Sequence, residues 1–281
     1  MGFYSESLGL SDTAFTILRD LIHDKTGLFF ENGKKDLLAD KLTIRVIENG
    51  FSNFMDYYYK LKYDENNEYE WFQLLNCLTV NETYFNREFD HIKLLVEYII
   101  PEHFSNNSTV PIKIWSAACS SGEEPLSIAM AINEAGYFEK YPIKIFASDV
   151  SLQALSIAKK GLYKERSFRN FPEYLRQKYF LNINGQWQID ENIHNKIEWF
   201  TKNLFNLEQF AFLNSSNVIF CRNVFIYFSD AAVKKVVEKF YEGMPQKGYL
   251  FVGVSESLLK LSTKFHLEEI NNTFFYFKNE K

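Results

Sequence analysis

The sequence predicts an α/β fold with a mainly parallel sheet, preceded by a small all-α domain and interrupted by a small inserted antiparallel sheet. Four short apolar runs rich in Ile, Val and Phe support the parallel sheet, because segments long enough for helices separate them. They are IKIWSA, IKIFASD, NVIFCRN and GYLFVGVS, which begin at residues 112, 143, 217 and 248. Apolar residues at helical spacing support the all-α domain, and an alternating stretch near residue 190 supports the insertion.

The N-terminal domain, residues 1–76, is expected to consist of short helices. Ser11 and Asp12 can cap the first, with Gly27 just past its end. The predicted helices cover about residues 13–25, residues 34–49 ahead of Gly50, the segment after Ser52 and the segment EYEWFQLLNCL. Beyond this domain, a longer helix is expected after the segment TVNETYFNRE, and it should end at Ile100 because Pro101 stops it.

Residues 77–281 are expected to form the second domain. Residues 179–204 alternate between apolar and polar and turn at Asn184–Gly185, which predicts an antiparallel unit inserted at about 166–202. The last apolar segments, GYLFVGVS and FFYFKN, lie close enough along the chain to end the sheet as an antiparallel pair.

Composition limits the possible class of protein. The 281 residues are 46% hydrophobic and 24% charged, which is typical of a globular chain. No apolar run approaches the roughly 20 residues of a membrane span, and the segment MGFYSESLGLSD lacks the features of a signal peptide. Cys77, Cys119 and Cys221 are widely spaced, and neither they nor the five His show ligand spacing. We therefore expect a cytoplasmic protein that is not inserted in a membrane and has no metal site.

Charge is distributed unevenly. Residues 1–75 carry eight Lys and Arg against thirteen Asp and Glu, which accounts for the whole formal net charge of -5. Nucleic acid is therefore not expected as a partner, because phosphate contacts need a basic surface. On the predicted second helix, Lys34, Lys41 and Arg45 fall on one side. They form either an ordinary solvated face or a local basic stripe.

The stretch IWSAACSSGEEPLSIAMAI, residues 114–132, indicates a ligand site. A strand, a loop of small residues that begins near Ala117, and a helix form the arrangement with which Rossmann-like folds bind phosphate. Glu123 and Glu124 open this helix, however, and would repel a pyrophosphate. Asp149 ends the next strand, where such folds hold ribose hydroxyls. A nucleoside with a cationic end, S-adenosylmethionine, fits this pattern.

Four motifs carry a family resemblance, in this order: NETYFNRE, WSAACSSGEEPLSIAMAI, ASDVSLQALSIAKKGLY and CRNVFIYF. With them the chain resembles the CheR family of chemotaxis protein methyltransferases over nearly its whole length. The resemblance implies a Rossmann-like S-adenosylmethionine-dependent methyltransferase domain. It also implies methyl transfer to glutamate side chains in the cytoplasmic domain of chemoreceptors, with S-adenosylhomocysteine as the second product.

The resemblance implies roles for individual residues. Arg87 and Tyr227 would face the methyl group and the incoming glutamate, and we expect them to orient it, because a glutamate of pKa about 4.3 is already ionised at neutral pH. Receptor recognition would fall mainly on the N-terminal helices around Lys34, Lys41 and Arg45. The cofactor-binding residues, including Ala117 of the small-residue loop, would be Asn81, Thr83, Arg87, Ala117, Glu123, Asp149, Asn203, Leu204, Arg222 and Asn223.

Other interpretations stay open from the sequence alone. Several of these residues could be helix caps, first-turn acids or core aromatics. The chain could be an S-adenosylmethionine sensor without catalysis, or a methyltransferase for another protein, an RNA or a small molecule. Some family members dock a peptide from the receptor C-terminus on the inserted sheet. The short turn NINGQW leaves no flap for such a peptide, so we expect no C-terminal pentapeptide tether.

Overall fold

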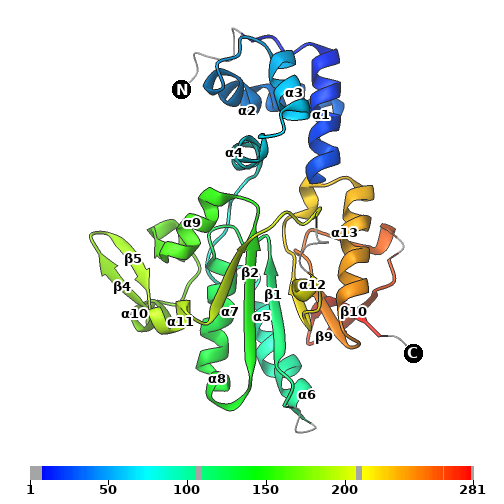
Figure 1. Ribbon diagram of the computed structural model, residues 1–281. Coiled ribbons are helices and arrows are strands. Elements are labelled where there is room, and N and C mark those ends of the chain that lie inside the picture. The colour runs from blue at the N-terminus through cyan, green and yellow to red at the C-terminus, as the bar shows by residue number, and fades with distance from the viewer. Residues whose placement is uncertain (1–7, 106–108, 207–210, 262, 280–281) are drawn as a thin grey trace.

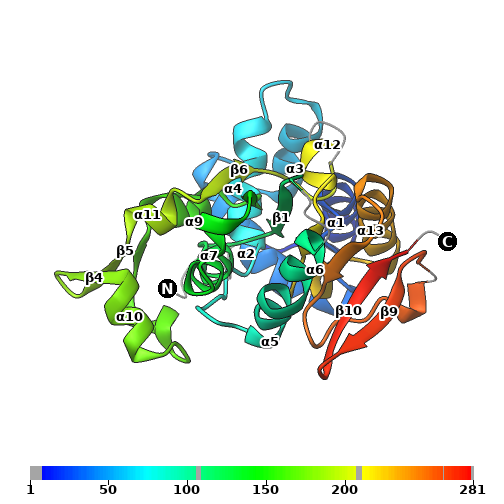
Figure 2. The same ribbon diagram turned by 90° about the horizontal axis from the view of Figure 1, so that it is seen from below.

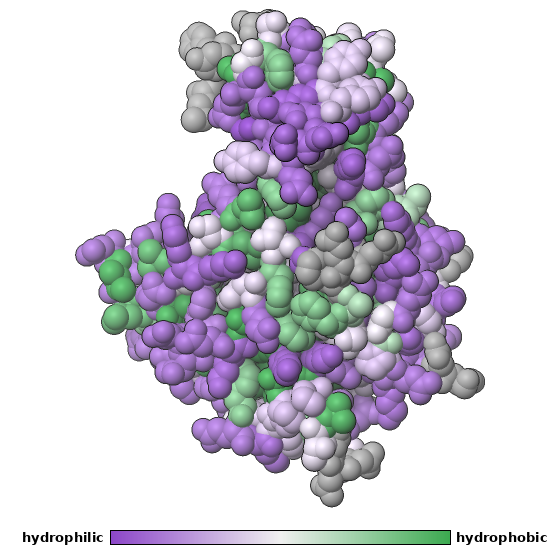
Figure 3. Space-filling model, in the orientation of Figure 1, coloured by the Kyte–Doolittle hydropathy of each residue, from purple (hydrophilic) through white to green (hydrophobic). Residues whose placement is uncertain are grey.

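The computed structural model describes residues 8–105, 109–206, 211–261 and 263–279. A helical unit stands above a larger α/β body, and the two meet at a narrow waist (Figure 1, Figure 3). The helical unit consists of α1 (Asp12–Thr26), α2 (Lys35–Glu48), α3 (Phe54–Tyr63) and α4 (Glu68–Leu78). Within the described ranges, none of the helices combines the length and apolar character that a membrane crossing requires.

The first helix forms as its end signals predict. The Ser11 hydroxyl accepts a hydrogen bond from the Ala14 N–H, and Gly27 closes the helix in the left-handed region with φ 78°. Leu18 and Ile22 lie on its buried face in the core of the helical unit. The prediction of this helix is confirmed.

A seven-stranded sheet forms the centre of the larger body. Its strand order is β6-β2-β1-β7-β8-β10-β9. The strands are β1 (Ile112–Ala117), β2 (Ile143–Asp149), β6 (Ile197–Thr201), β7 (Val218–Phe220), β8 (Gly248–Phe251), β9 (His266–Ile270) and β10 (Thr273–Lys278). The first five in spatial order pair in parallel, whereas β10 is antiparallel to both β8 and β9. The parallel sheet and its antiparallel end are confirmed, while β9 was not predicted.

Helices cover both faces of this sheet (Figure 1, Figure 2). Neighbouring residues of a strand point to opposite faces, so Ile114 packs in one apolar core and Trp115 in the other. The described helices of the larger body are α5 (Phe89–Leu94), α6 (Ile100–Phe104), α7 (Glu123–Glu134), α8 (Tyr137–Lys140), α9 (Leu152–Lys160), α10 (Glu173–Tyr179), α11 (Glu191–His194), α12 (Ala211–Asn214) and α13 (Asp230–Gly243). Because both faces are covered, the central parallel strands carry apolar residues on both faces.

The predicted stop at Pro101 is wrong. A π-helical turn, Leu95–Ile99, joins α5 to α6, and the Ile100 N–H donates to the carbonyl of Leu95, five residues back. Pro101 then lies in the first turn of α6, where its missing N–H costs little. The helix therefore continues to Phe104.

The inserted antiparallel sheet differs in extent from the prediction. Its strand order is β3-β5-β4. These strands are β3 (Leu162–Tyr163), β4 (Phe180–Ile183) and β5 (Gln186–Ile189). The predicted range of 166–202 is therefore too late at both ends, because the sheet begins at Leu162 and β6 belongs to the large sheet, paired in parallel with β2. An alternating pattern could not distinguish an edge strand of the large sheet from a strand of the small one.

Chain direction in the sheet points to a ligand site. Successive crossovers place β2 and β6 on one side of β1 and β7 and β8 on the other, so the carboxyl ends of β1 and β7 flank a topological switch point. The helical unit closes this end: the Phe29 N–H donates to the Tyr227 carbonyl at 2.9 Å, and Leu28 forms a β-bridge with Phe228.

Candidate active site

A cavity lies at the switch point and contains about 940 Å³ of empty space, its open mouth included. Its walls come from the helical unit, the loop before α5, the loop after β1, the end of β2 and the segments that follow β6 and β7. Nine of the predicted site residues line it: Asn81, Thr83, Arg87, Asp149, Asn203, Leu204, Arg222, Asn223 and Tyr227.

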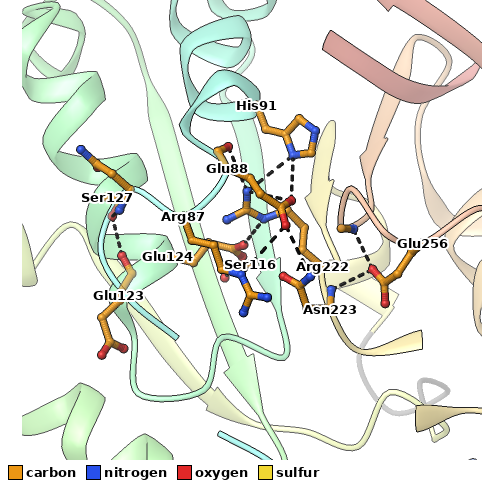
Figure 4. Close-up of polar contacts among 12 residues, drawn as sticks. Arg87, Glu88, His91, Ser116, Glu123, Glu124, Ser127, Arg222, Asn223 and Glu256 are labelled. Atoms are coloured by element: carbon orange, nitrogen blue, oxygen red, sulfur yellow. Dashed lines mark hydrogen bonds and ion pairs between the residues drawn. The ribbon is translucent and has the colours of Figure 1, made fainter. Parts of the chain in front are cut away.

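Two predicted cofactor residues do not line this cavity. Ala117 is buried within β1, and its neighbour Ala118 takes the position on the wall. Glu123 points away (Figure 4), with its carboxylate accepting hydrogen bonds from Ser121 and Ser167 at 2.7 and 2.9 Å. Burial raises the pKa of this carboxyl.

Glu124, and not Glu123, is the helix-opening acid on the cavity wall. Its carboxylate accepts from the Ser116 hydroxyl at 2.6 Å and from Arg222 Nε, also at 2.6 Å. Adjacent positions of a helix face different directions, so one of two consecutive acids necessarily points elsewhere. The assignment of the cavity acid to Glu123 is therefore corrected to Glu124.

Arg222 follows β7, and the positive charge of its buried guanidinium is balanced by carboxylates of the protein itself (Figure 4). Its side chain is 3% exposed and forms ion pairs with Glu124 at 2.6 Å and with Glu88 at 3.6 Å. Its Nη1 also lies 3.5 Å from His91 Nδ1. Burial, together with this cation, lowers the pKa of His91 to about 3, so the imidazole is neutral and can accept from Arg222. Arg222 thus fixes the cavity wall and has no charge left over for an anion.

The loop after β1 has an unusual backbone. Ala118 and Ser120 have φ of 61° and 51°, and Gly122 has 93°. A Cβ at Gly122 would lie 2.9 Å from the Ala158 Cβ and from the Trp199 ring. Non-glycine residues in the left-handed region cost free energy and cluster at functional sites. This loop therefore supports the cavity as a site, independently of its shape.

Asp149 holds the same loop. One carboxylate oxygen accepts from the Ser120 N–H and the other from the Ser151 N–H, both at 2.8 Å. Burial raises the pKa of Asp149, and these backbone donors oppose the rise. Each oxygen keeps a further lone pair, so the carboxylate can accept ligand hydroxyls as well.

Arg87 and Tyr227 lie on the same cavity, as predicted. Arg87 Nη1 donates to the Glu82 carbonyl at 3.0 Å, which leaves other N–H groups of the guanidinium for a ligand. Burial raises the pKa of Tyr227, so its hydroxyl keeps its proton and can donate. The pair can hold one carboxylate by two hydrogen bonds.

Glu256 was missed by the sequence analysis. Its Oε2 accepts from the N–H groups of Asn223 and Gly253, both at 2.7 Å, and its Oε1 accepts from Ile226 at 3.2 Å. It thereby fixes the turn that carries Arg222 and Asn223 (Figure 4). Tyr227 directly follows Ile226, whose N–H is held by the same carboxylate. Glu256 lies about 30 residues after the turn, so no pattern in the neighbouring sequence connects the two. Lys202 also lines the cavity and was not predicted.

Arg45 does not form an exposed basic stripe. It is 8% exposed, and its guanidinium donates to both oxygens of Glu70, at 2.9 and 2.5 Å, and to Glu48. The Tyr57 hydroxyl donates to the same Glu70 at 2.6 Å. Arg45 is thus part of the core of the helical unit.

Lys41 is also directed inward. Its Nζ donates to the carbonyls of Cys77 and Leu78 at 2.9 and 3.2 Å, where it caps the end of α4. Burial lowers its pKa. Of the three predicted recognition residues, Lys34 alone is exposed. The sequence left two alternatives for this side of α2, a solvated face and a basic stripe, and both are wrong because Lys41 and Arg45 bind groups inside the protein.

The described residues contain no group of three or more His, Cys, Asp and Glu side chains that could hold a metal ion. The cavity instead offers carboxylates, amides, two arginines, a lysine and a phenol. Such a set can bind a polar, partly cationic organic ligand and place a second, anionic group beside it.

Sequence comparisons with known proteins indicate the same kind of ligand. Residues 13–79 match the family described as CheR methyltransferase, all-alpha domain, and residues 81–274 match CheR methyltransferase, SAM binding domain. Chemotaxis protein methyltransferase 2 of Vibrio cholerae serotype O1 is 36% identical over 274 residues, which cover 97% of this chain and 95% of that protein. The chemotaxis protein methyltransferase of Escherichia coli K12 is 30% identical over 267 residues, or 94% and 91% of the two chains.

Proposed function

The chain belongs to the CheR methyltransferase family, and on that premise we propose that it methylates glutamate side chains in the cytoplasmic domain of a chemoreceptor. The methyl donor is S-adenosylmethionine, and the products are a glutamate methyl ester and S-adenosylhomocysteine. The main supporting observation is that one cavity combines the acids Glu124 and Asp149 with the carboxylate-binding pair Arg87 and Tyr227.

The residues of the cavity fit this donor. When bound, S-adenosylmethionine supplies a methyl group on a positively charged sulfur atom. Glu124 and Asp149 provide negative charge for a cationic ligand, and we assign the ribose hydroxyls to Asp149. Leu28 and Leu204 offer apolar surface to the adenine, with Asn203 beside them. Arg222 is already neutralised by two carboxylates, so it does not repel the ligand.

The acceptor carboxylate is assigned to Arg87 and Tyr227. A glutamate is ionised at neutral pH, so the reaction needs no general base. The guanidinium and the phenol hold one carboxylate oxygen and direct the other toward the methyl group. Because a paired oxygen is a weaker nucleophile, their contribution is alignment and exclusion of water.

Several finer assignments belong to the same proposal. We assign residues 1–76 to a helical domain and 77–281 to the methyltransferase domain, and we place the protein in the cytoplasm, where the receptor domain it modifies is found. Nucleic acid is not proposed as a partner, since the net charge is -5.

We also propose that no C-terminal pentapeptide tethers the enzyme to its receptor. The turn between β4 and β5 consists of Asn184 and Gly185, both with positive φ, and forms no flap. The open edge of β4 is the place where such a peptide could pair. A fluorescence titration with the free peptide should show no saturable binding at micromolar concentrations, and saturation would disprove this part of the proposal.

Methyl transfer tests the function directly. Labelled S-adenosylmethionine and a purified cytoplasmic receptor fragment should give labelled protein, and mild base should release the label because the product is an ester. Binding of the donor without transfer would indicate a sensor, and base-stable label would indicate a different acceptor.

A further inference from the structure

A basic surface lies beside the candidate active site, on the turn between β3 and α10. It consists of Lys164, Arg166 and Arg169, all exposed, and we call it the basic turn. Residues 159–178, which include it, carry seven Lys and Arg against two Asp and Glu. This excess is the reverse of the acidic balance in the N-terminal helices.

The basic turn faces the active site across a single loop. Arg166 and Arg169 line a cleft whose opposite wall is the segment 80–83. The same four residues line the catalytic cavity on their other side. A chain that occupies the cleft would therefore lie next to the acceptor position.

Arg169 is connected to the catalytic arginine through Tyr84. Its guanidinium lies 3.8 Å from the centroid of the Tyr84 ring, and Arg87 lies 5.8 Å from the same centroid. Arg169 also pairs with Glu82 at 3.0 Å, and Arg87 donates to the Glu82 carbonyl. Arg169 therefore has a structural partner and helps to place the loop.

Arg166 and Lys164 differ from Arg169 in this respect. Within the described residues, neither side chain forms a hydrogen bond or an ion pair within 4 Å. Arg166 is near enough to the buried Glu123 to lower the pKa of that carboxyl slightly, against the larger upward effect of burial. By contrast, Arg176 and Lys178 in the same region are paired with Glu165, Glu173 and Glu134. Two cations beside the active site thus remain available to an external anion.

We propose that the basic turn binds carboxylates that neighbour the methylated glutamate on the receptor. This inference rests on the proposed function, because the partner is the methyl-accepting segment itself. Charge complementarity favours an acidic segment, since the cations lie one loop away from the residues that hold the acceptor carboxylate. The acidic helical unit, whose Lys41 and Arg45 are used internally, would repel such a segment. Receptor recognition therefore lies mainly on the methyltransferase domain.

Charge reversal of Arg166 tests the proposal, since among the described residues this side chain makes no hydrogen bond or close ion pair that the substitution would break. Arg166→Glu, alone and with Lys164→Glu, is compared with Lys144→Glu, an exposed lysine near the amino end of β2. Methyl transfer is measured against the concentration of a purified receptor cytoplasmic fragment at low and high salt, and the affinity for S-adenosylmethionine is measured by calorimetry.

For Arg166→Glu we expect the KM for the receptor fragment to rise about tenfold at low salt, as for the loss of a charged contact at an interface rim. The kcat and the affinity for S-adenosylmethionine should stay unchanged, and the KM should depend less on salt. Lys144→Glu should behave like the wild type. A KM for Arg166→Glu equal to that of Lys144→Glu would overturn the inference while wild-type transfer still supports the function. Absence of transfer by the wild-type protein would overturn both.

Discussion

Removal of Arg45 should destabilise the helical unit, because this residue balances a buried acid. Glu70 has a side chain that is 6% exposed, and it accepts two hydrogen bonds from Arg45 and one from Tyr57. In Arg45→Ala the Glu70 carboxylate stays buried and loses both hydrogen bonds from Arg45, while the hydrogen bond from Tyr57 remains. Lys34 offers a matched control, since it is an exposed cation just before the same helix.

The expected cost is about 3 kcal/mol of unfolding free energy. Breaking a buried ion pair from one side typically costs about 3–5 kcal/mol. The lower end applies here because Tyr57 continues to donate, and because the second partner of Arg45, Glu48, is 58% exposed and contributes little. Lys34→Ala should change stability by less than about 0.5 kcal/mol.

Urea denaturation followed by circular dichroism measures both variants. A loss below about 1 kcal/mol for Arg45→Ala would refute the buried-pair argument. If Arg45→Ala were stable but had a raised KM for the receptor, the result would instead support the original prediction that Arg45 contacts the receptor. The comparison matters because a charge reversal at Arg45 would lower activity by unfolding alone.

Three further predictions concern the cavity and the buried pair. Asp149→Ala should weaken binding of S-adenosylmethionine by about ten- to a hundredfold in calorimetry, because it removes hydrogen bonds to a charged group, and unchanged affinity in a folded variant would remove Asp149 from the site. Tyr227→Phe should lower kcat while the affinity for S-adenosylmethionine barely changes, and equal loss of both would indicate a structural role. Finally, the pKa of Glu70 is lowered, since hydrogen bonds from Arg45 and Tyr57 outweigh the upward effect of burial. Its stabilising contribution is complete above the unfolded pKa of about 4.3 and is lost as pH falls, so acid should destabilise the wild type more than Arg45→Ala.

Features that depend on neighbouring residues could be predicted from the sequence. The capping hydroxyl of Ser11 and the left-handed Gly27 follow from short-range sterics and hydrogen bonding, and the apolar run of β1 is visible directly in the sequence. Asp149 could be predicted because it ends an apolar run, and the carboxyl ends of successive parallel strands meet at one edge of the sheet.

Features that depend on distant partners could not be predicted. The residues next to Lys41 in the sequence do not show that it donates to carbonyls at the end of α4. Those next to Arg45 do not show that it pairs with Glu70. Likewise, the cavity position of Glu124 depends on Arg222, 98 residues later. A cation or an acid in a sequence is therefore weak evidence for an external ligand until its internal partners are known.

The helical unit contributes residues to the cavity wall, and this leads to a last prediction. Leu28 lines the cavity although it lies outside the matched SAM binding domain, and its β-bridge with Phe228 holds it there. Leu10 is an ideal comparison, since it belongs to the same apolar core, is also 8% exposed, and does not line the cavity. Both substitutions to Ala should destabilise the fold by about 2–3 kcal/mol.

Only Leu28→Ala should also weaken binding of S-adenosylmethionine. Loss of about one buried methylene of ligand contact corresponds to roughly 1 kcal/mol, or about fivefold in affinity. Calorimetry on both folded variants decides the question. Equal affinities for Leu28→Ala and Leu10→Ala would mean that the helical unit supports the cavity only through folding, whereas a selective loss would make it a wall of the donor site.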